Sequence, residues 1–217
     1  MDKREKAKKV LDILEQEFPE AKSALEFKNP LELLIATILS AQATDKLVNR
    51  VTPELFKKYK SAKDYALAPI EEIERMIGSV NFFRNKARNI KACASRIAEV
   101  HNGKVPDKLE ELTELPGVGR KTANIVLGNA FGKNALAVDT HVKRVAQRLG
   151  LTENDDPDRI EADLCKIIPP ERWTRTTHLF IMHGRTTCKA ASPKCETCPI
   201  KDYSVYYKTE YKRIRKG

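Results

Sequence analysis

The chain has 217 residues, 41% hydrophobic and 32% charged, a balance typical of a folded soluble protein with one large or two small domains. Lys and Arg number 40 against 30 Asp and Glu, so the net charge of +10 predicts a polyanionic partner, either nucleic acid or an anionic membrane surface. The longest strongly apolar stretch, residues 31–39, is too short to span a bilayer, and residues 1–6 contain no apolar signal region. These features argue against a membrane-spanning or secreted protein, and we expect a cytosolic one, or a nuclear one in a eukaryote.

Helical periodicity recurs along the chain, and no segment alternates as a half-buried strand does, so we predict an all-α fold. The first helix covers residues 3–17 and has one apolar and one charged face. The second begins at Pro30 and is apolar on nearly all sides up to Leu39, which places it in the core. Further helices are predicted at residues 48–59, 62–67, 69–76, 85–101, 123–130, 140–149, 157–167 and 173–183.

The second helix leads into a short polar run, residues 40–45, that has two interpretations. Thr44 or Asp45 is a suitable cap for the helix that follows, and local physics favours this structural role. Alternatively, Gln42 faces a ligand at the surface. The local sequence does not decide between the two.

Two adjacent aromatic residues, Phe82 and Phe83, stand in a loop of Gly, Ser and Asn before a helix rich in Lys and Arg. Taken alone, the pair favours packing of both rings in the core. An exposed apolar side chain beside basic residues would instead suit a protein that wedges into DNA and kinks it. Cys93, on the apolar side of the following helix, is interpreted as a small buried hydrophobe.

The segment Leu-Pro-Gly-Val-Gly-Arg-Lys-Thr, residues 115–122, joins two predicted helices by a tight turn. Asp107 is expected to cap the helix before it, and Gly132 to end the helix after it. Gly117 and Gly119 permit backbone angles that leave N–H groups bare just before a helix N-terminus, a place that binds anions such as phosphate. The alternative is an ordinary helix connection, which turn chemistry alone favours.

Two features follow further along the chain. Asp139 precedes the helix of residues 140–149 and has the side chain of a good N-cap, which is its structural interpretation. The tail from Tyr203 to Gly217 is rich in Tyr, Lys and Arg, so it either contacts a DNA backbone or is disordered.

Three of the five cysteines lie close together in the sequence, and in a reducing compartment such a cluster indicates metal binding rather than disulfides. Cys195-x-x-Cys198 is a metal-binding signature, and Cys188 is near enough to be a third ligand. A fourth cysteine is missing from this group. An iron–sulfur cluster usually takes four thiolates, whereas a zinc site would recruit His183, although spacing alone favours a helix-end role for this histidine.

Together these segments resemble the endonuclease III family of the helix-hairpin-helix DNA glycosylase superfamily. The resemblance covers residues 3–204, and a Leu-Pro-Gly-Val-Gly hairpin followed by Lys121 and then by Asp139 is far more specific than the hairpin alone. The matching blocks, which precede the spaced cysteines, are Leu-Leu-Ile-Ala-Thr-Ile-Leu-Ser-Ala-Gln-Ala-Thr-Asp at 33–45, Leu-Pro-Gly-Val-Gly-Arg-Lys-Thr-Ala-Asn at 115–124, Ala-Val-Asp-Thr-His-Val at 137–142 and His-Gly-Arg-Thr-Thr-Cys at 183–188.

The resemblance implies two helical domains that flank a DNA-binding cleft. One would be a six-helix barrel of residues 22–132, with a helix-hairpin-helix motif at about 108–131. The other would join residues 1–21 to residues 133–217 and carry a C-terminal iron–sulfur cluster loop at 188–204. The implied cofactor is a [4Fe-4S] cluster. The implied protein is a cytoplasmic, nucleoid-associated monomer. It would bind duplex DNA that contains damaged bases or abasic sites, and it would not bind a membrane.

The implied activity is base excision repair, by a DNA glycosylase that removes oxidised pyrimidines and an abasic-site lyase that cuts the strand by β-elimination through a lysine Schiff base. By matching position, Lys121 is the nucleophile and Asp139 the essential carboxylate. Gln42 and Phe82 match the residues that fill the gap and wedge the duplex once the nucleotide is flipped out. The other implied DNA contacts are Gly117, Val118, Gly119, Arg120, His141, Lys189 and Lys194.

Two positions depart from the family pattern. Ser204 stands where the family has its fourth cluster cysteine, and a serine oxygen is a harder, weaker ligand for iron–sulfur than a thiolate. The sequence leaves open whether the cluster is absent, incomplete or serine-ligated. Asn81 stands where the family usually has a glycine before Phe82, and this change is expected to alter the loop geometry and with it the lesion preference.

Two alternative functions fit parts of the sequence. A mismatch-specific glycosylase of the same fold, without lyase activity, would share the hairpin, but such relatives usually lack a lysine at the position of Lys121. A non-catalytic helix-hairpin-helix module would bind DNA without needing Lys121 to be paired with Asp139.

Overall fold

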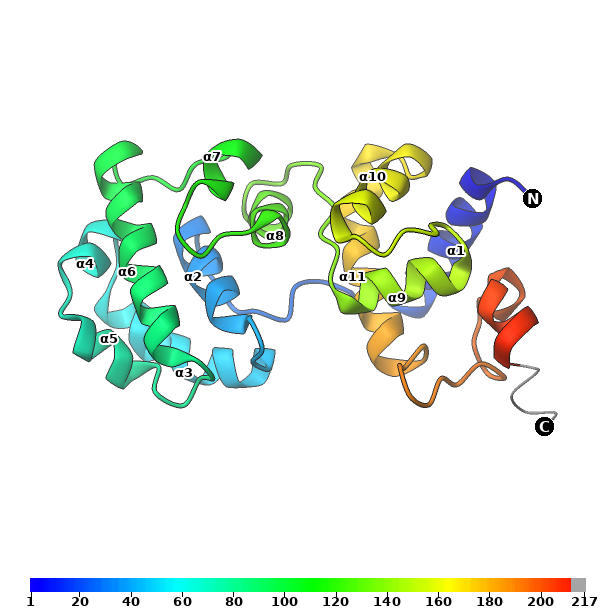
Figure 1. Cartoon of the computed structure of the whole chain (residues 1–217), viewed down its shortest axis with the longest axis horizontal. Coiled ribbons are helices and arrows are strands. Elements are labelled where there is room, and N and C mark those ends of the chain that lie inside the picture. Colours follow the sequence, from blue (N-terminus) through cyan, green and yellow to red (C-terminus); the bar gives the residue numbers. More distant parts are fainter. Residues whose placement is uncertain (212–217) are drawn as a thin grey trace. The chain divides into compact units, whose positions relative to one another are not determined.

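The computed structural model describes residues 1–211, and this part of the chain is helical without any β-strand, which confirms the predicted all-α fold (Figure 1). The chain divides into two compact units: unit 1 comprises Met1–Lys22 and Asn134–Gly217, and unit 2 comprises Ser23–Lys133. The end of the basic tail, residues 212–217, lies outside the described residues. No helix in the described range is long and apolar enough to cross a membrane.

Unit 2 is built around helix α2 (Pro30–Ser40), which contacts α3, α6 and α8 (Figure 1). Within α2, no residue from Leu33 to Leu39 is more than 4% exposed, which confirms the prediction that this helix lies in the core. A helix that is apolar on all faces is stable only when other elements surround it. The surrounding helices are α3 (Asp45–Lys58), α4 (Ala62–Leu67), α5 (Ile70–Met76), α6 (Phe83–Val100), α7 (Leu109–Thr113) and α8 (Arg120–Ala130).

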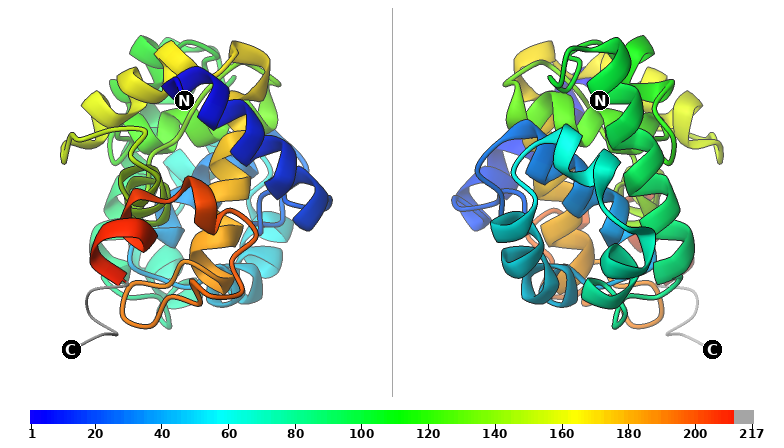
Figure 2. Two further views of the ribbon diagram at one scale, coloured as in Figure 1. Left: turned by 90° about the vertical axis from the view of Figure 1, so that its right-hand side faces the viewer. Right: turned by 90° about the vertical axis from the view of Figure 1, so that its left-hand side faces the viewer.

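Unit 1 joins the N-terminal helix to helices of the second half of the chain in one core. Helix α1 (Lys3–Glu17) packs its apolar face on α10 and α11 (Figure 2). The guanidinium of Arg175 donates to the backbone oxygens of Phe18, Pro19 and Ala21, so it holds the segment that leaves α1. The other elements are α9 (Thr140–Leu149), α10 (Pro157–Ile167), η1 (Pro170–Arg172), α11 (Trp173–Thr186), η2 (Lys201–Tyr203) and η3 (Tyr207–Tyr211).

The helix starts follow the predicted capping chemistry at several places and differ at one. Thr44 caps α3, and Asp139 caps α9, each accepting from a backbone N–H in the first turn. The prediction that Asp107 caps the helix before the hairpin is wrong, because α7 begins after Lys108 and has no side-chain cap. The carboxylate of Asp107 instead pairs with the ammonium of Lys133 at 2.7 Å.

The turn between α7 and α8 depends on a glycine. Gly117 has φ of +77°, and a Cβ atom placed on it would lie 2.8 Å from Cβ of Asn89 on α6. We therefore expect Gly117→Ala to lower the free energy of unfolding by about 1–3 kcal/mol, measured by urea denaturation. Gly119→Ala is the matched control, because φ there is −88° and nothing lies within 4 Å, so its loss should not exceed the roughly 1 kcal/mol expected for a poorer N-cap residue. Equal losses for the two variants would contradict the assignment of strain to Gly117.

Candidate functional site

The hairpin presents backbone amides in front of a helix. Gly119 is the N-cap of α8, and no side chain caps this helix. Within the described residues, the N–H groups of Gly117 and Gly119 donate no hydrogen bond, whereas the N–H of Val118 donates to the oxygen of Leu115 at 3.0 Å. The expectation of bare amides is therefore wrong for Val118. The remaining amides and the positive end of the helix dipole form a local site for an anion.

Lys121 follows directly in the first turn of α8, and its side chain is exposed, as is that of Arg120. Ala123, Val126 and Leu127 are buried on the face of α8 that packs into unit 2. Because that face fixes the rotation of the helix, Lys121 is held at the surface beside the uncapped amides. A primary amine in this position is a nucleophile once it is deprotonated.

Asp139 in unit 1 has one oxygen engaged and one available. Its Oδ1 accepts hydrogen bonds from the backbone N–H groups of His141 and Val142, both at 2.8 Å. Within residues 1–211, its Oδ2 accepts no hydrogen bond. The cap therefore fixes the orientation of the carboxylate while leaving an oxygen for chemistry, so the structural and functional interpretations of Asp139 are compatible.

His141, the next predicted site residue, is half-buried where α9 packs against α11. Its Nδ1 lies 3.0 Å from Nη2 of Arg144, and the same Arg144 nitrogen donates to the oxygen of Gly184 at 2.9 Å. A Cβ atom on Gly184 would lie only 3.0 Å from Cβ of His141. Burial lowers the pKa of His141 below its usual value. The neutral imidazole is thus held in one place by close packing.

Gln42 and Phe82, the residues predicted to enter the duplex, share an unusual backbone conformation. Their φ values are +53° and +59°, and Asn102 is the other non-glycine residue with positive φ in the described range. Left-handed backbone costs about 1–3 kcal/mol for such residues and often marks a functional site. Phe82 is 65% exposed, so the interpretation that both aromatic rings are in the core is wrong. The ring of the neighbouring Phe83 is covered by the guanidinium of Arg84, which lies 4.9 Å from the ring centroid.

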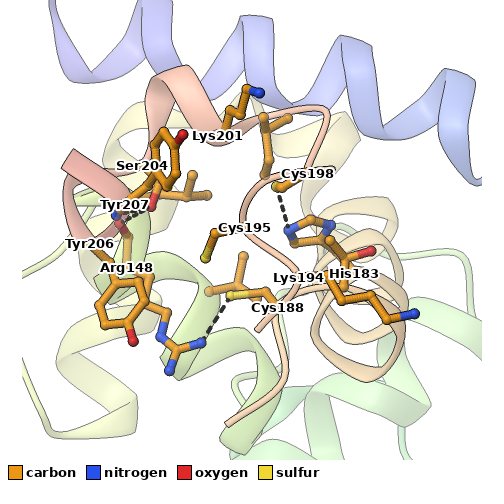
Figure 3. A pocket seen from close by; sticks show the side chains of 14 residues that line it. Arg148, His183, Cys188, Lys194, Cys195, Cys198, Lys201, Ser204, Tyr206 and Tyr207 are labelled. Atoms are coloured by element: carbon orange, nitrogen blue, oxygen red, sulfur yellow. Dashed lines mark hydrogen bonds between the residues drawn. The ribbon is translucent and has the colours of Figure 1, made fainter. Parts of the chain in front are cut away.

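Figure 3 shows the cysteine loop of unit 1, where the side chains of Cys188, Cys195 and Cys198 line one pocket together with Ser204. Cys198 Sγ lies 3.7 Å from Nε2 of His183. His183 is buried, which lowers the pKa of its imidazole to about 4. Lys189 and Lys194, predicted DNA contacts on the same loop, are both exposed.

Ser204 is engaged with the backbone. Its Oγ donates to the oxygen of Arg148 at 3.1 Å and accepts from the N–H of Tyr207 at 3.1 Å. A hydroxyl that donates to a carbonyl keeps its proton, so it is a poor metal ligand in this arrangement. The fourth position of the loop is thus occupied by a capping hydroxyl.

The arrangement distinguishes between the two metal sites considered from the sequence. A single zinc ion needs its four ligands at about 2.0–2.3 Å from one point. Within residues 1–211, no three His, Cys, Asp or Glu side chains are close enough together to hold one metal ion, which argues against a zinc site made of the three cysteines and His183. The three thiols that line the pocket are the type of donor that an iron–sulfur cluster takes, whereas Ser204 offers an oxygen at the remaining position.

Two contributors were not singled out in the sequence. Arg148 on α9 donates to the sulfur of Cys188 at 3.4 Å and to the oxygen of Lys189 at 2.8 Å, and its guanidinium lies 4.2 Å from the ring centroid of Tyr206. Lys86 on α6 is buried, although it belongs to a helix rich in Lys and Arg. Long-range partners define both roles, and no local pattern carries that signal.

Three comparisons with known proteins bear on this site. The sequence profile described as "HhH-GPD superfamily base excision DNA repair protein" matches residues 35–170. The chain is 50% identical over 199 residues to endonuclease III of Synechocystis sp. (91% of each chain), and 49% identical to that of Bacillus subtilis (88% of this chain, 87% of the relative). A solved structure of a trapped endonuclease III–DNA covalent intermediate superposes with a TM-score of 0.92 at 47% identity, covering 99% of this chain and 100% of the other.

The double hydrogen bond at Asp139 makes a prediction about stability. Asp139→Ala removes the α9 cap and should lower the free energy of unfolding by about 1 kcal/mol, whereas Asp139→Asn keeps a capping oxygen and should stay close to the native value. Thermal or urea denaturation of the two variants measures the difference. Equal destabilisation by both substitutions would show that the cap is not what Asp139 contributes to folding.

Proposed function

The chain belongs to the HhH-GPD superfamily of base excision DNA repair proteins, and we propose that it is a DNA glycosylase for oxidised pyrimidines with abasic-site lyase activity in which Lys121 is the nucleophile. The observation that carries the assignment is the exposed Lys121 ammonium directly after the uncapped amides of the hairpin. A site that grips a phosphate next to a primary amine places that amine near the sugar of the same strand.

In the first step the neutral amine of Lys121 attacks C1′ of the damaged nucleotide. The bond between C1′ and the base breaks, the base leaves with the bonding electrons and takes up a proton, and a C1′–Nζ bond forms. Opening of the sugar ring gives a Schiff base. The Schiff base acidifies the hydrogen on C2′, so its loss expels the 3′ phosphate by β-elimination and cuts the strand. Water then releases the sugar fragment from Lys121.

Asp139 supplies the carboxylate. Its free Oδ2 stabilises the positive charge that develops on the sugar, or takes a proton from the attacking amine. An ionised carboxylate suits both roles, and the two backbone N–H groups that donate to Oδ1 hold the carboxylate in one orientation.

Recognition of DNA is assigned to groups of the hairpin, of the two loops beside it and of the cysteine loop. The amides of Gly117 and Gly119 and the side chain of Arg120 hold a phosphate, Val118 supports the turn, and His141 faces the nucleotide. Gln42 and Phe82 enter the duplex, because a base inside a stack is out of reach until the nucleotide is extruded. Lys189 and Lys194 meet the backbone elsewhere. The protein works as a monomer on chromosomal DNA in the cytoplasm, at the nucleoid.

Members of this family normally carry a [4Fe-4S] cluster. We propose that in this chain Cys188, Cys195 and Cys198 hold the cluster and that Ser204 is not a ligand, since its hydroxyl is engaged with Arg148 and Tyr207. When bound, the cluster supplies structural support to the loop that carries Lys189 and Lys194, because the reaction has no redox step.

Covalent trapping tests the nucleophile. Borohydride added during reaction with abasic-site DNA should reduce the Schiff base and give a stable protein–DNA adduct on a denaturing gel. Lys121→Ala should abolish the adduct, because the variant lacks the amine, while its affinity for undamaged duplex stays within a fewfold of the native value. An adduct of undiminished yield in the variant would show that another amine reacts.

Turnover on a damaged duplex tests Asp139. Asp139→Asn preserves the helix cap and should lower turnover on a thymine-glycol duplex by at least about 100-fold, since a charge that stabilises the transition state is lost. Turnover at the native rate in this variant would remove Asp139 from the mechanism without affecting the assignment of Lys121.

Iron content tests the three-thiolate assignment. Ser204→Cys supplies a fourth thiolate and should raise both the iron bound per chain and the visible absorbance of the cluster, whereas Cys198→Ser should lower both below the native level. The Ser204→Cys variant loses the hydrogen bond to the oxygen of Arg148, so its stability is measured alongside. Unchanged iron content on Ser204→Cys would contradict the assignment.

A further inference from the structure

Two loops of unit 2 that are far apart in the sequence are joined by direct hydrogen bonds. One loop follows α2 and carries Gln42, and the other precedes α6 and carries Phe82. The side-chain amide of Asn81 donates from Nδ2 to the backbone oxygen of Gln42 at 3.0 Å. This bond ties the residue next to Phe82 to the backbone of Gln42 itself.

Lys86 adds further hydrogen bonds to the same two segments. Its backbone N–H donates to the oxygen of Phe82 at 3.1 Å, and its ammonium donates to the oxygens of Leu39 and Ala41 at 2.8 and 2.6 Å. The side chain is only 5% exposed. Carbonyls at the end of a helix lack partners within the helix, and a buried cation there satisfies them and interacts favourably with the helix dipole. Lys86 therefore fixes where α2 ends relative to the start of α6.

The side chains of Gln42 and Phe82 do not hold their own loops in place. Both are exposed, and both residues have left-handed backbone that persists only where surrounding contacts determine it. From the neighbouring segment, Asn81 contacts the backbone of Gln42, and Lys86 contacts the backbone of Ala41, the residue before Gln42. Gln42, Phe82 and the hairpin residue Gly117 line one open pocket of unit 2, so the linked loops lie beside the proposed phosphate site.

We propose that Asn81 is a positioning residue. Together with the hydrogen bonds of Lys86, it holds the Gln42 loop against the Phe82 loop, so that the two side chains enter the duplex in a fixed relative position. This inference rests on the proposed function. Because the two loops are ordered before binding, less conformational entropy is lost when DNA binds. The free-energy cost of extruding the nucleotide is lowered as a result.

The test compares two lesion substrates in the native enzyme and in Asn81→Ala. One duplex carries thymine glycol paired with adenine, and the other carries it in a bulge, where the nucleotide is already unpaired and extrusion costs less. Loss of a single hydrogen bond should lower kcat/KM on the paired lesion by roughly three- to tenfold and leave the bulged lesion nearly unchanged. Asn81→Asp has the same shape but cannot donate to the oxygen of Gln42, so it should show a loss at least as large.

Ser79→Ala is the matched control, because Ser79 is an exposed polar residue of the same loop and makes no hydrogen bond within the described residues. It should leave the ratio of the two substrates at the native value. An equal loss of kcat/KM on both substrates in Asn81→Ala would indicate a merely structural role. A native ratio of kcat/KM on the two substrates in Asn81→Asp would show that the hydrogen bond donated by the Asn81 amide is not needed. Either result overturns the inference.

The outcomes also separate this inference from the function on which it rests. If the native enzyme excises neither lesion and forms no borohydride adduct, the proposed function fails. If the native enzyme excises both lesions and the Asn81 variants excise them equally well, the proposed function stands and the positioning role of Asn81 is wrong.

Discussion

The burial of α2 is the constraint on which the rest of unit 2 depends. Because this helix is apolar on every face, other helices must enclose it, and among those that contact it are α6 and α8. The proposed functional segments extend from the ends of these helices: Gln42 just after α2, Phe82 at the start of α6, and Lys121 at the start of α8. Packing of one apolar core helix thus sets the spacing of the groups that are proposed to enter the duplex and to react with it.

The sequence predicted the elements well where local chemistry decides them. The periodicity of α1, the all-round apolar character of α2 and the caps at Thr44 and Asp139 are local patterns, and the structure has them. Prediction failed at Asp107, because a lysine distant in sequence, Lys133, takes its carboxylate. Local reasoning likewise failed at Phe82, since composition favours burial of an aromatic ring and only the fold shows that this side chain is exposed. Lys121 and Asp139 were assigned as a pair through resemblance, because turn and cap chemistry gave each an adequate structural explanation.

The cysteine loop illustrates how one departure from the family pattern is absorbed. A serine at position 204 removes a thiolate, yet its hydroxyl bonds to Arg148 and Tyr207, and Arg148 in turn reaches the sulfur of Cys188 and the oxygens of Lys189 and Ala190. Hydrogen bonds within the chain therefore hold both sides of the loop. The exposed Lys189 and Lys194 are supported by this network as well as by any metal that the cysteines bind.

The shared core of α1 with α10 and α11 also sets the order in which the protein matures on the ribosome. Helix α1 is made first, but its partners lie beyond residue 134, so the whole of unit 2 is translated before α1 can bury its apolar face. At about 5–20 residues per second this delay is on the order of ten seconds. Unit 2 is a continuous segment and can fold during that time, whereas the apolar face of α1 stays without its partners. Asp139 and the three cysteines of the loop belong to the same unit as α1, so their surroundings form only after unit 2 has been translated.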